Sequence, residues 1–209
     1  MRGYVPDLIA FTQGGPYLLA ALAFGYLLGS VPFGMVMARV FNLGNLRDVG
    51  SGNIGATNVL RTGSKKAAIL TLLFDMLKGT IAVLIAVQWG PMTAAVAGFG
   101  AFLGHCFPVW LKFKGGKGVA TFLGAFLGLH WPTFLAMAAT WLVVAFMTRI
   151  SSLSALIAAA AAPILLALFG TNEYVWIAVP MAALLWWRHR ENIARLLKGE
   201  ESKISFGKK

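Results

Sequence analysis

The chain has 209 residues, of which 58% are hydrophobic and only 12% are charged, and its formal net charge is +11. Soluble domains carry about 25% charged residues, so this composition excludes an ordinary soluble domain and indicates a membrane protein. A soluble protein this basic would be expected to bind nucleic acid. Here the basic residues flank apolar segments, so lipid headgroups and membrane topology explain most of the charge, and no nucleic acid partner is expected.

A membrane-spanning helix needs about 20 apolar residues, and fewer where the helix is buried in a bundle. Seven apolar segments of 12 to 25 residues are candidates, and the fourth and fifth are marginal in length: residues 16–40, 67–89, 92–111, 119–130, 133–147, 152–169 and 174–187. Pro32 lacks a backbone donor, so the first segment should kink there. The sequence therefore predicts a single all-α membrane domain, 1–209, with seven transmembrane helices, several of them short. The fourth and fifth segments could instead form a re-entrant pair, leaving five spans and the same loop faces.

The basic residues lie in alternate loops. Apart from Arg2 and Lys78, every Lys and Arg lies at the end of, or after, the first, third, fifth or seventh segment, and the loops near residues 88–91, 129–132 and 170–173 contain none. Lys and Arg are enriched in cytoplasmic loops. We therefore expect residues 1–15 outside, the C-terminus and the tail 200–209 in the cytoplasm, and three polar segments together on the cytoplasmic face.

The first polar segment, residues 50–58, carries three glycines within six residues. Glycine permits positive φ angles and lets a ligand approach the backbone amides closely. Ser51, Asn53 and Asn58 add neutral donors, and Arg61 follows the segment, a set suited to an anionic ligand. The alternative is a polar loop in which Asn or Thr caps a helix.

The second polar segment is Gly115-Gly116-Lys117-Gly118, which precedes an apolar helix. It fails the nucleotide-binding phosphate-loop pattern, because the required earlier glycine is Leu111 and no Ser or Thr follows the lysine. ATP is therefore not expected as a ligand. Glycine amides at a helix N-terminus, together with a lysine, still form a phosphate cradle. The alternative is a basic loop that only sets topology.

The third polar segment, residues 187–192, continues from the last apolar segment. His189 and Asn192 are three residues apart, so they share one face of a helix, and a histidine there can donate a hydrogen bond or titrate. The alternative is an interfacial histidine without a role. Asp75 and Lys78 lie inside the second segment, where unpaired charges are costly. We interpret them as a structural ion pair, in preference to a proton relay.

Three groups of motifs resemble those of the bacterial acyl-phosphate:glycerol-3-phosphate acyltransferase family, PlsY. They are residues 29–34 with 50–58, residues 104–109 with 115–121, and residues 151–154 with 187–192. The resemblance covers about residues 25–199. It implies a multi-pass enzyme of the bacterial inner membrane with a cytoplasmic-face active site. Such an enzyme transfers a fatty acyl group from acyl phosphate to the sn-1 hydroxyl of glycerol 3-phosphate, giving lysophosphatidic acid and phosphate. We expect a monomer without cofactor or metal.

By this resemblance, Ser51, Arg61, Lys117, Ser154, His189 and Asn192 occupy functional positions. We assign catalysis to Ser51, His189 and Asn192. Combined with the donors of the polar segments, the predicted substrate-binding residues are Asn53, Asn58, Arg61, Gly115, Gly116, Lys117, Gly118, Arg149, Ser152 and Ser154.

Acyl phosphate is already activated, so the protein needs to position substrates and stabilise charge more than to supply a nucleophile. Other glycerol-phosphate acyltransferases place Asp five residues after a catalytic His. The residues five positions after the three histidines here are Trp110, Leu135 and Ala194. We therefore expect direct attack by the substrate hydroxyl, with His189 or the substrate's phosphate as base. An acyl-Ser51 or acyl-Cys106 intermediate is the alternative route.

Two other functions fit parts of the sequence. A small-anion transporter would suit seven helices and the embedded Asp75 and Lys78, but it predicts polar residues throughout the membrane depth rather than at one face. A nucleotide-dependent enzyme is disfavoured by the failed phosphate-loop pattern.

Overall fold

The computed structural model describes residues 8–204, and every regular element in that range is helical. The chain forms two compact units, Met1–Trp131 and Pro132–Lys209. The α-helices of the first unit are α1 (Leu8–Gly29), α2 (Phe33–Val40), α3 (Ala56–Leu60), α4 (Lys65–Ala86), α5 (Pro91–Cys106) and α6 (Val119–Leu129). Its 3-10 helices are η1 (Leu46–Asp48), η2 (Val87–Trp89) and η3 (Val109–Leu111). The second unit contains α7 (Trp131–Thr148), α8 (Ser151–Leu168), η4 (Asn172–Tyr174), α9 (Val175–Arg188) and α10 (Arg190–Leu197).

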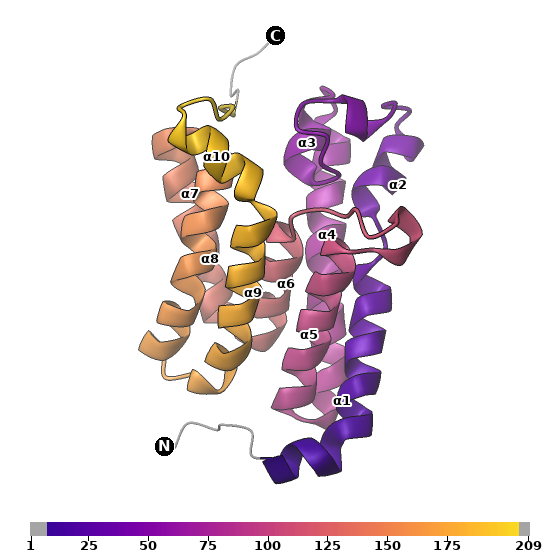
Figure 1. Ribbon diagram of the computed structural model, residues 1–209, viewed down its shortest axis with the longest axis vertical. Helices are drawn as coiled ribbons and strands as arrows, with labels where there is room; N and C mark the ends of the chain where they lie inside the picture. Colours follow the sequence, from indigo (N-terminus) through magenta and orange to yellow (C-terminus); the bar gives the residue numbers. More distant parts are fainter. Residues whose placement is uncertain (1–7, 205–209) are drawn as a thin grey trace. The chain divides into compact units, whose positions relative to one another are not determined.

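In the first unit, α1, α4 and α5 run side by side (Figure 1). Glycines at a spacing of four residues allow α1 and α5 to approach closely, a common arrangement between membrane helices. A Cβ on Gly25 would lie 2.1 Å from the carbonyl oxygen of Ala97, and one on Gly104 would lie 2.1 Å from that of Tyr26. Any larger residue at either glycine would therefore push the two backbones apart.

Helix α4 packs against α6 and carries the charged pair predicted from the sequence. Lys78 Nζ lies 2.8 Å from Asp75 Oδ1, and both side chains are buried, which confirms the predicted ion pair. Hydroxyl donors join the two backbones, because Thr121 Oγ1 donates to the Asp75 carbonyl and Thr80 Oγ1 donates to the Gly124 carbonyl, each at 2.8 Å. These contacts fix α4 beside the start of α6.

All seven predicted segments are helical, and five helical stretches among the described residues are long and apolar enough to cross a membrane: Gly14–Val40, Lys65–Trp89, Pro91–Leu111, Trp131–Thr148 and Ser151–Leu168. Helices α6 and α9 are shorter, at 11 and 14 residues. The expected kink at Pro32 is a complete break, since α1 ends at Gly29 and α2 begins at Phe33.

The first apolar segment was predicted to begin at Pro16, with residues 1–15 outside the membrane. Helix α1 begins earlier, at Leu8, and contains Pro16 within it, and the placement of residues 1–15 outside the membrane stays a prediction. Pro16 lies far enough from the start of α1 to lose one intrahelical hydrogen bond, yet the helix continues through it. Residues 1–7 lie outside the described range.

In the second unit, α8 packs against α9, and Trp186 Nε1 donates to the Leu156 carbonyl at 3.1 Å. Helix α10 lies at the same end of this unit as the connection between α7 and α8 (Figure 1). The chain after α10 returns to that connection, where the amide of Ile204 donates to the carbonyl of Arg149 at 2.6 Å.

Candidate functional site

The loop of residues 50–55 folds around the side-chain amide of Asn58, at the start of α3. Asn58 is buried. Its Nδ2 donates to the carbonyl oxygens of Leu46 at 2.9 Å and Asn53 at 2.7 Å, and its Oδ1 accepts from the Ser51 amide at 3.1 Å. Asn58 therefore shapes the loop and sets the position of Ser51. The role of Asn58 in substrate binding remains a prediction. Its side-chain amide already makes these three hydrogen bonds within the protein.

Gly50 lies between two predicted donors, Ser51 in the loop and the side chain of Arg61, which follows α3. Gly50 adopts a φ of +53°, a conformation that side chains disfavour. A Cβ at this position would lie 2.7 Å from Arg61 Cδ and 2.7 Å from Asn58 Oδ1. The Arg61 side chain thus lies against the residue that precedes Ser51. Both Ser51 and Arg61 are exposed, so a hydroxyl and a guanidinium flank one glycine where an anion has access.

The Gly115–Gly118 segment is anchored to the C-terminal end of α5. The Gly115 amide donates to the Cys106 carbonyl at 3.1 Å, and the Gly116 amide donates to the His105 carbonyl at 3.0 Å. Gly118 caps α6 with a φ of +88°. The amides of Gly115 and Gly116 are therefore used in hydrogen bonds that hold the loop against α5. The candidate phosphate donors in this segment are therefore the Lys117 side chain and the first-turn amides of α6. A helix leaves the amides of its first turn without intrahelical partners.

A side chain that the sequence analysis did not select connects the first two polar segments. The guanidinium of Arg47, in η1, donates to the carbonyl oxygen of Lys114. This contact joins the loop before residues 50–58 to the loop before Lys117. Helices α2 and α3 and the loop before α6 lie at one end of the first unit (Figure 1). The first two polar segments therefore share one end of this unit, as the charge pattern predicted.

In the second unit, His189 lies at the junction of α9 and α10. Its Nδ1 is 2.8 Å from the Leu185 carbonyl oxygen. A carbonyl only accepts, so Nδ1 carries the hydrogen of that bond and the neutral ring has its lone pair on Nε2. This tautomer suits a general base. Both His189 and Asn192 are buried.

Glu201 binds three side chains of the second unit. Its carboxylate accepts from Asn192 Nδ2 at 2.5 Å, from Ser152 Oγ at 2.8 Å and from Arg195 Nε at 2.6 Å. Burial would raise the pKa of this carboxyl, but the hydrogen bonds from Asn192, Ser152 and Arg195 outweigh burial and lower that pKa. The segment 200–204, which the sequence analysis treated only as part of a tail, therefore fixes two predicted site residues.

The other predicted residues of the second unit have different surroundings. Ser154 is buried and its hydroxyl donates to the Ile150 carbonyl at 2.8 Å, one turn back in its own helix. Arg149 is exposed, has a φ of +61°, and offers its carbonyl to Ile204. Glu201 thus brings together Ser152 and Asn192, whereas the Ser154 hydroxyl bonds within its own helix.

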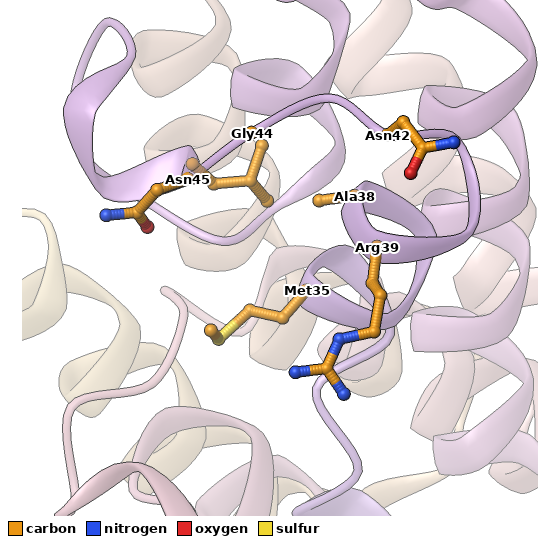
Figure 2. Close-up of a pocket in the computed structure, with 7 residues that line it drawn as sticks. Met35, Ala38, Arg39, Asn42, Gly44 and Asn45 are labelled. Atoms are coloured by element: carbon orange, nitrogen blue, oxygen red, sulfur yellow. The ribbon is translucent and has the colours of Figure 1, made fainter.

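A surface hollow of about 370 Å³ is lined by residues of α2, η1 and the loop between them, including Leu46, whose carbonyl accepts from Asn58. Figure 2 shows Arg39 extending from α2, with Asn42 and Asn45 on the loop that follows. Among the described residues that line the hollow, Arg39 is the one that carries a charge.

Comparison with known proteins identifies the family. The family model described as glycerol-3-phosphate acyltransferase matches residues 19–199. The chain belongs to the glycerol-3-phosphate acyltransferase family. The protein named glycerol-3-phosphate acyltransferase from Brucella anthropi is 57% identical over 187 residues, covering 90% of this chain and 93% of that protein. The protein of the same name from Nitrobacter winogradskyi is 58% identical over 190 residues, covering 90% and 97%.

Two crystal structures of PlsY, an integral membrane glycerol 3-phosphate acyltransferase, share this fold. The glycerol 3-phosphate form has a TM-score of 0.85 and 41% identity, and it covers 90% of this chain and 96% of that chain. The lysophosphatidic acid form has a TM-score of 0.82 and 38% identity, covering 90% and 95%. These likenesses confirm the family proposed from the motifs and the all-helical membrane architecture.

Within residues 8–204, no group of three or more His, Cys, Asp or Glu residues is placed to hold a metal ion. Sequence reasoning did not select Arg47 or Glu201. The one available signal for Glu201 was an acidic residue within an otherwise basic tail.

Proposed function

We propose that this protein is a membrane glycerol-3-phosphate acyltransferase whose donor is acyl phosphate and whose products are lysophosphatidic acid and phosphate. The observation that carries the proposal is the family match over residues 19–199, which spans all three polar segments. The solved relatives are described with glycerol 3-phosphate and with lysophosphatidic acid, a substrate and a product of such a reaction. A small-anion transporter is not favoured.

For this reaction the protein must bind the phosphate groups of acyl phosphate and glycerol 3-phosphate and promote one substitution at the acyl carbon. The sn-1 hydroxyl oxygen bonds to the acyl carbon, the bond from that carbon to the phosphate oxygen breaks, and phosphate leaves with the electron pair. We assign phosphate binding to Arg61, to Lys117 and to the first-turn amides of α6. His189 accepts the hydroxyl proton at Nε2, with a substrate phosphate as the alternative base. Asn192 and Ser51 position the reacting groups.

The basic loops support a multi-pass protein of the bacterial inner membrane with its active site on the cytoplasmic face, N-terminus outside and C-terminus inside. The five long helices together with α6 and α9 make seven spans under this proposal. We propose that the protein acts as a monomer and uses neither ATP nor nucleic acid.

Replacing Lys117 tests the phosphate assignment. Lys117→Ala removes a cation from the cradle while the loop keeps the backbone bonds of Gly115 and Gly116 to α5. A hydrogen bond to a charged group contributes about 1.5–3 kcal/mol. We therefore expect the KM of one of the two phosphate substrates to rise roughly 10- to 150-fold, with an unchanged Tm in detergent.

Lys112→Ala is the matched control for this experiment, because Lys112 is an exposed lysine of the same loop. It should keep wild-type kinetics. Wild-type KM values for both substrates in Lys117→Ala would remove the second polar segment from the proposed site.

The direct mechanism is tested by mixing the purified enzyme with labelled acyl phosphate in the absence of glycerol 3-phosphate. We expect no labelled protein after rapid quenching. Label retained on Ser51 or Cys106, at a level that glycerol 3-phosphate discharges, would establish a covalent intermediate instead.

A further inference from the structure

A buried cluster of Asp75, Lys78 and His105 lies in the first unit next to the Gly115–Gly118 segment. Lys78 Nζ is 2.8 Å from Asp75 Oδ1, 2.9 Å from the Val31 carbonyl oxygen and 2.9 Å from His105 Nδ1. His105 Nδ1 also lies 3.4 Å from Asp75 Oδ1, the oxygen that pairs with Lys78, and an ammonium has three hydrogens and no acceptor. Nδ1 of His105 is therefore the acceptor of the bond from Lys78.

The opposite edge of the same imidazole lies against Gly116. A Cβ on Gly116 would be 2.1 Å from His105 Nε2, 2.9 Å from Cε1 and 3.0 Å from Cδ2. The three nearest atoms all belong to the ring. The His105 carbonyl also accepts the Gly116 amide at 3.0 Å, so His105 contacts this glycine through both its backbone and its side chain.

The ring has little freedom to move. His105 is 5% exposed and Lys78 is 2% exposed. Turning the imidazole away would leave a buried ammonium short of one acceptor, which is strongly unfavourable. The residue after Gly116 is Lys117, which the proposed function assigns to a substrate phosphate.

We propose that His105 is a positioning residue, held by Lys78 and Asp75, that sets the backbone at Gly116 and thereby aims Lys117 and the first turn of α6 at a substrate phosphate. The proposal rests on the proposed function for the assignment of Lys117. Under this proposal the ion pair of Asp75 and Lys78 contributes to the reaction indirectly. Neither charged residue contacts the substrate, and both act by holding His105.

The first test is His105→Asn. The Asn side-chain oxygen still accepts from Lys78, while Nε2 and Cε1, the two ring atoms nearest Gly116, are removed. We expect the KM of the same substrate that Lys117→Ala affects to rise about tenfold or more, because small misplacements of binding groups have large effects on turnover. The other substrate's KM should stay within about twofold of wild type.

His130→Asn is the matched control, because it makes the same exchange at the far end of α6, about 16 Å along the helix. It should leave both KM values unchanged. A His105→Asn enzyme with wild-type KM for both substrates would overturn the proposal, and so would one with only a lower yield of folded protein.

The second test is suppression. Gly116→Ala alone should raise the same KM and lower the Tm, because its Cβ meets a ring that is held in place. Adding His105→Asn should recover at least tenfold of the lost kcat/KM, together with part of the Tm. Single-variant losses that multiply in the double variant would overturn the proposal. If His105→Asn does not fold, Gly116→Ala alone decides, and an unchanged KM and Tm in that variant overturns the contact.

The Tm of Gly116→Ala with and without His105→Asn tests this proposal independently of the proposed function. A wild-type protein that folds but transfers no acyl group from acyl phosphate refutes the function. The suppression of the Gly116→Ala Tm defect still reports whether His105 contacts Gly116.

Discussion

Glu201→Gln tests whether the carboxylate of residue 201 fixes the chain end against the second unit. The substitution keeps an oxygen for Ser152 and Asn192 but places an amide nitrogen opposite the donor of Arg195, which lies 2.6 Å from the native carboxylate. A hydrogen bond between charged groups contributes about 1.5–3 kcal/mol. Arg195 is 36% exposed, so solvent screening favours the lower part of that range. We expect the free energy of opening residues 199–204 to fall by about 2 kcal/mol.

The assay is hydrogen exchange of detergent-solubilised protein, read on peptides that contain Ile204. The Ile204 amide bonds to the Arg149 carbonyl at 2.6 Å, so its exchange reports the opening of this segment. A 2 kcal/mol loss corresponds to roughly 30-fold faster exchange. Glu200→Gln is the control, since Glu200 is the exposed neighbour of the same chemistry, and it should exchange at the wild-type rate. Equal exchange in the two variants would refute the role of Glu201.

Three further predictions concern pH and packing. Because the pKa of Glu201 is lowered on folding, its stabilisation is complete above the ordinary glutamate pKa of about 4.3 and is lost as pH falls through the lower folded-state pKa. The protection of residues 199–204, measured relative to the intrinsic exchange rate at each pH, should therefore fall below about pH 4 in wild type. An identical loss of protection in Glu201→Gln would contradict this. Asn58→Asp places an oxygen where Nδ2 lies 2.9 Å and 2.7 Å from two carbonyl oxygens, so we expect a loss of about 2–4 kcal/mol in the free energy of unfolding, measured by denaturation in mixed micelles; wild-type stability would show that the loop does not depend on this amide. Gly124→Ala would place a Cβ 1.9 Å from the Met76 carbonyl oxygen, so the Tm of this variant should fall by several degrees. Gly15→Ala is the control, because a Cβ at Gly15 would have nothing within 4 Å. Equal Tm values in the two variants would argue against close packing of α4 on α6.

The helices could be predicted from the sequence because the membrane imposes a simple requirement. A chain in lipid satisfies its backbone groups within helices, so apolar runs of sufficient length identify α4, α5, α7 and α8 directly. Polar loops were recognisable for the complementary reason. The motifs around Gly50 and Gly118 contain glycines because the backbone there adopts positive φ, and this requirement is visible in the sequence itself.

The contacts that shape the site could not be predicted, because they join residues distant in sequence. Nothing near Gly115 and Gly116 indicates that their amides bind the carbonyls of α5. The carboxylate of Glu201 reaches Ser152, 49 residues earlier. Composition shows how many donors a loop carries, and only the tertiary structure shows which of them are already used.

The most direct test of the acyltransferase assignment is a product measurement on purified protein in detergent with synthetic acyl phosphate and labelled glycerol 3-phosphate. The assignment predicts lysophosphatidic acid and inorganic phosphate in equal amounts, with phosphate release that requires glycerol 3-phosphate and needs no ATP. Phosphate release that is independent of glycerol 3-phosphate, or lysophosphatidic acid formed only when acyl-coenzyme A replaces acyl phosphate, would contradict it.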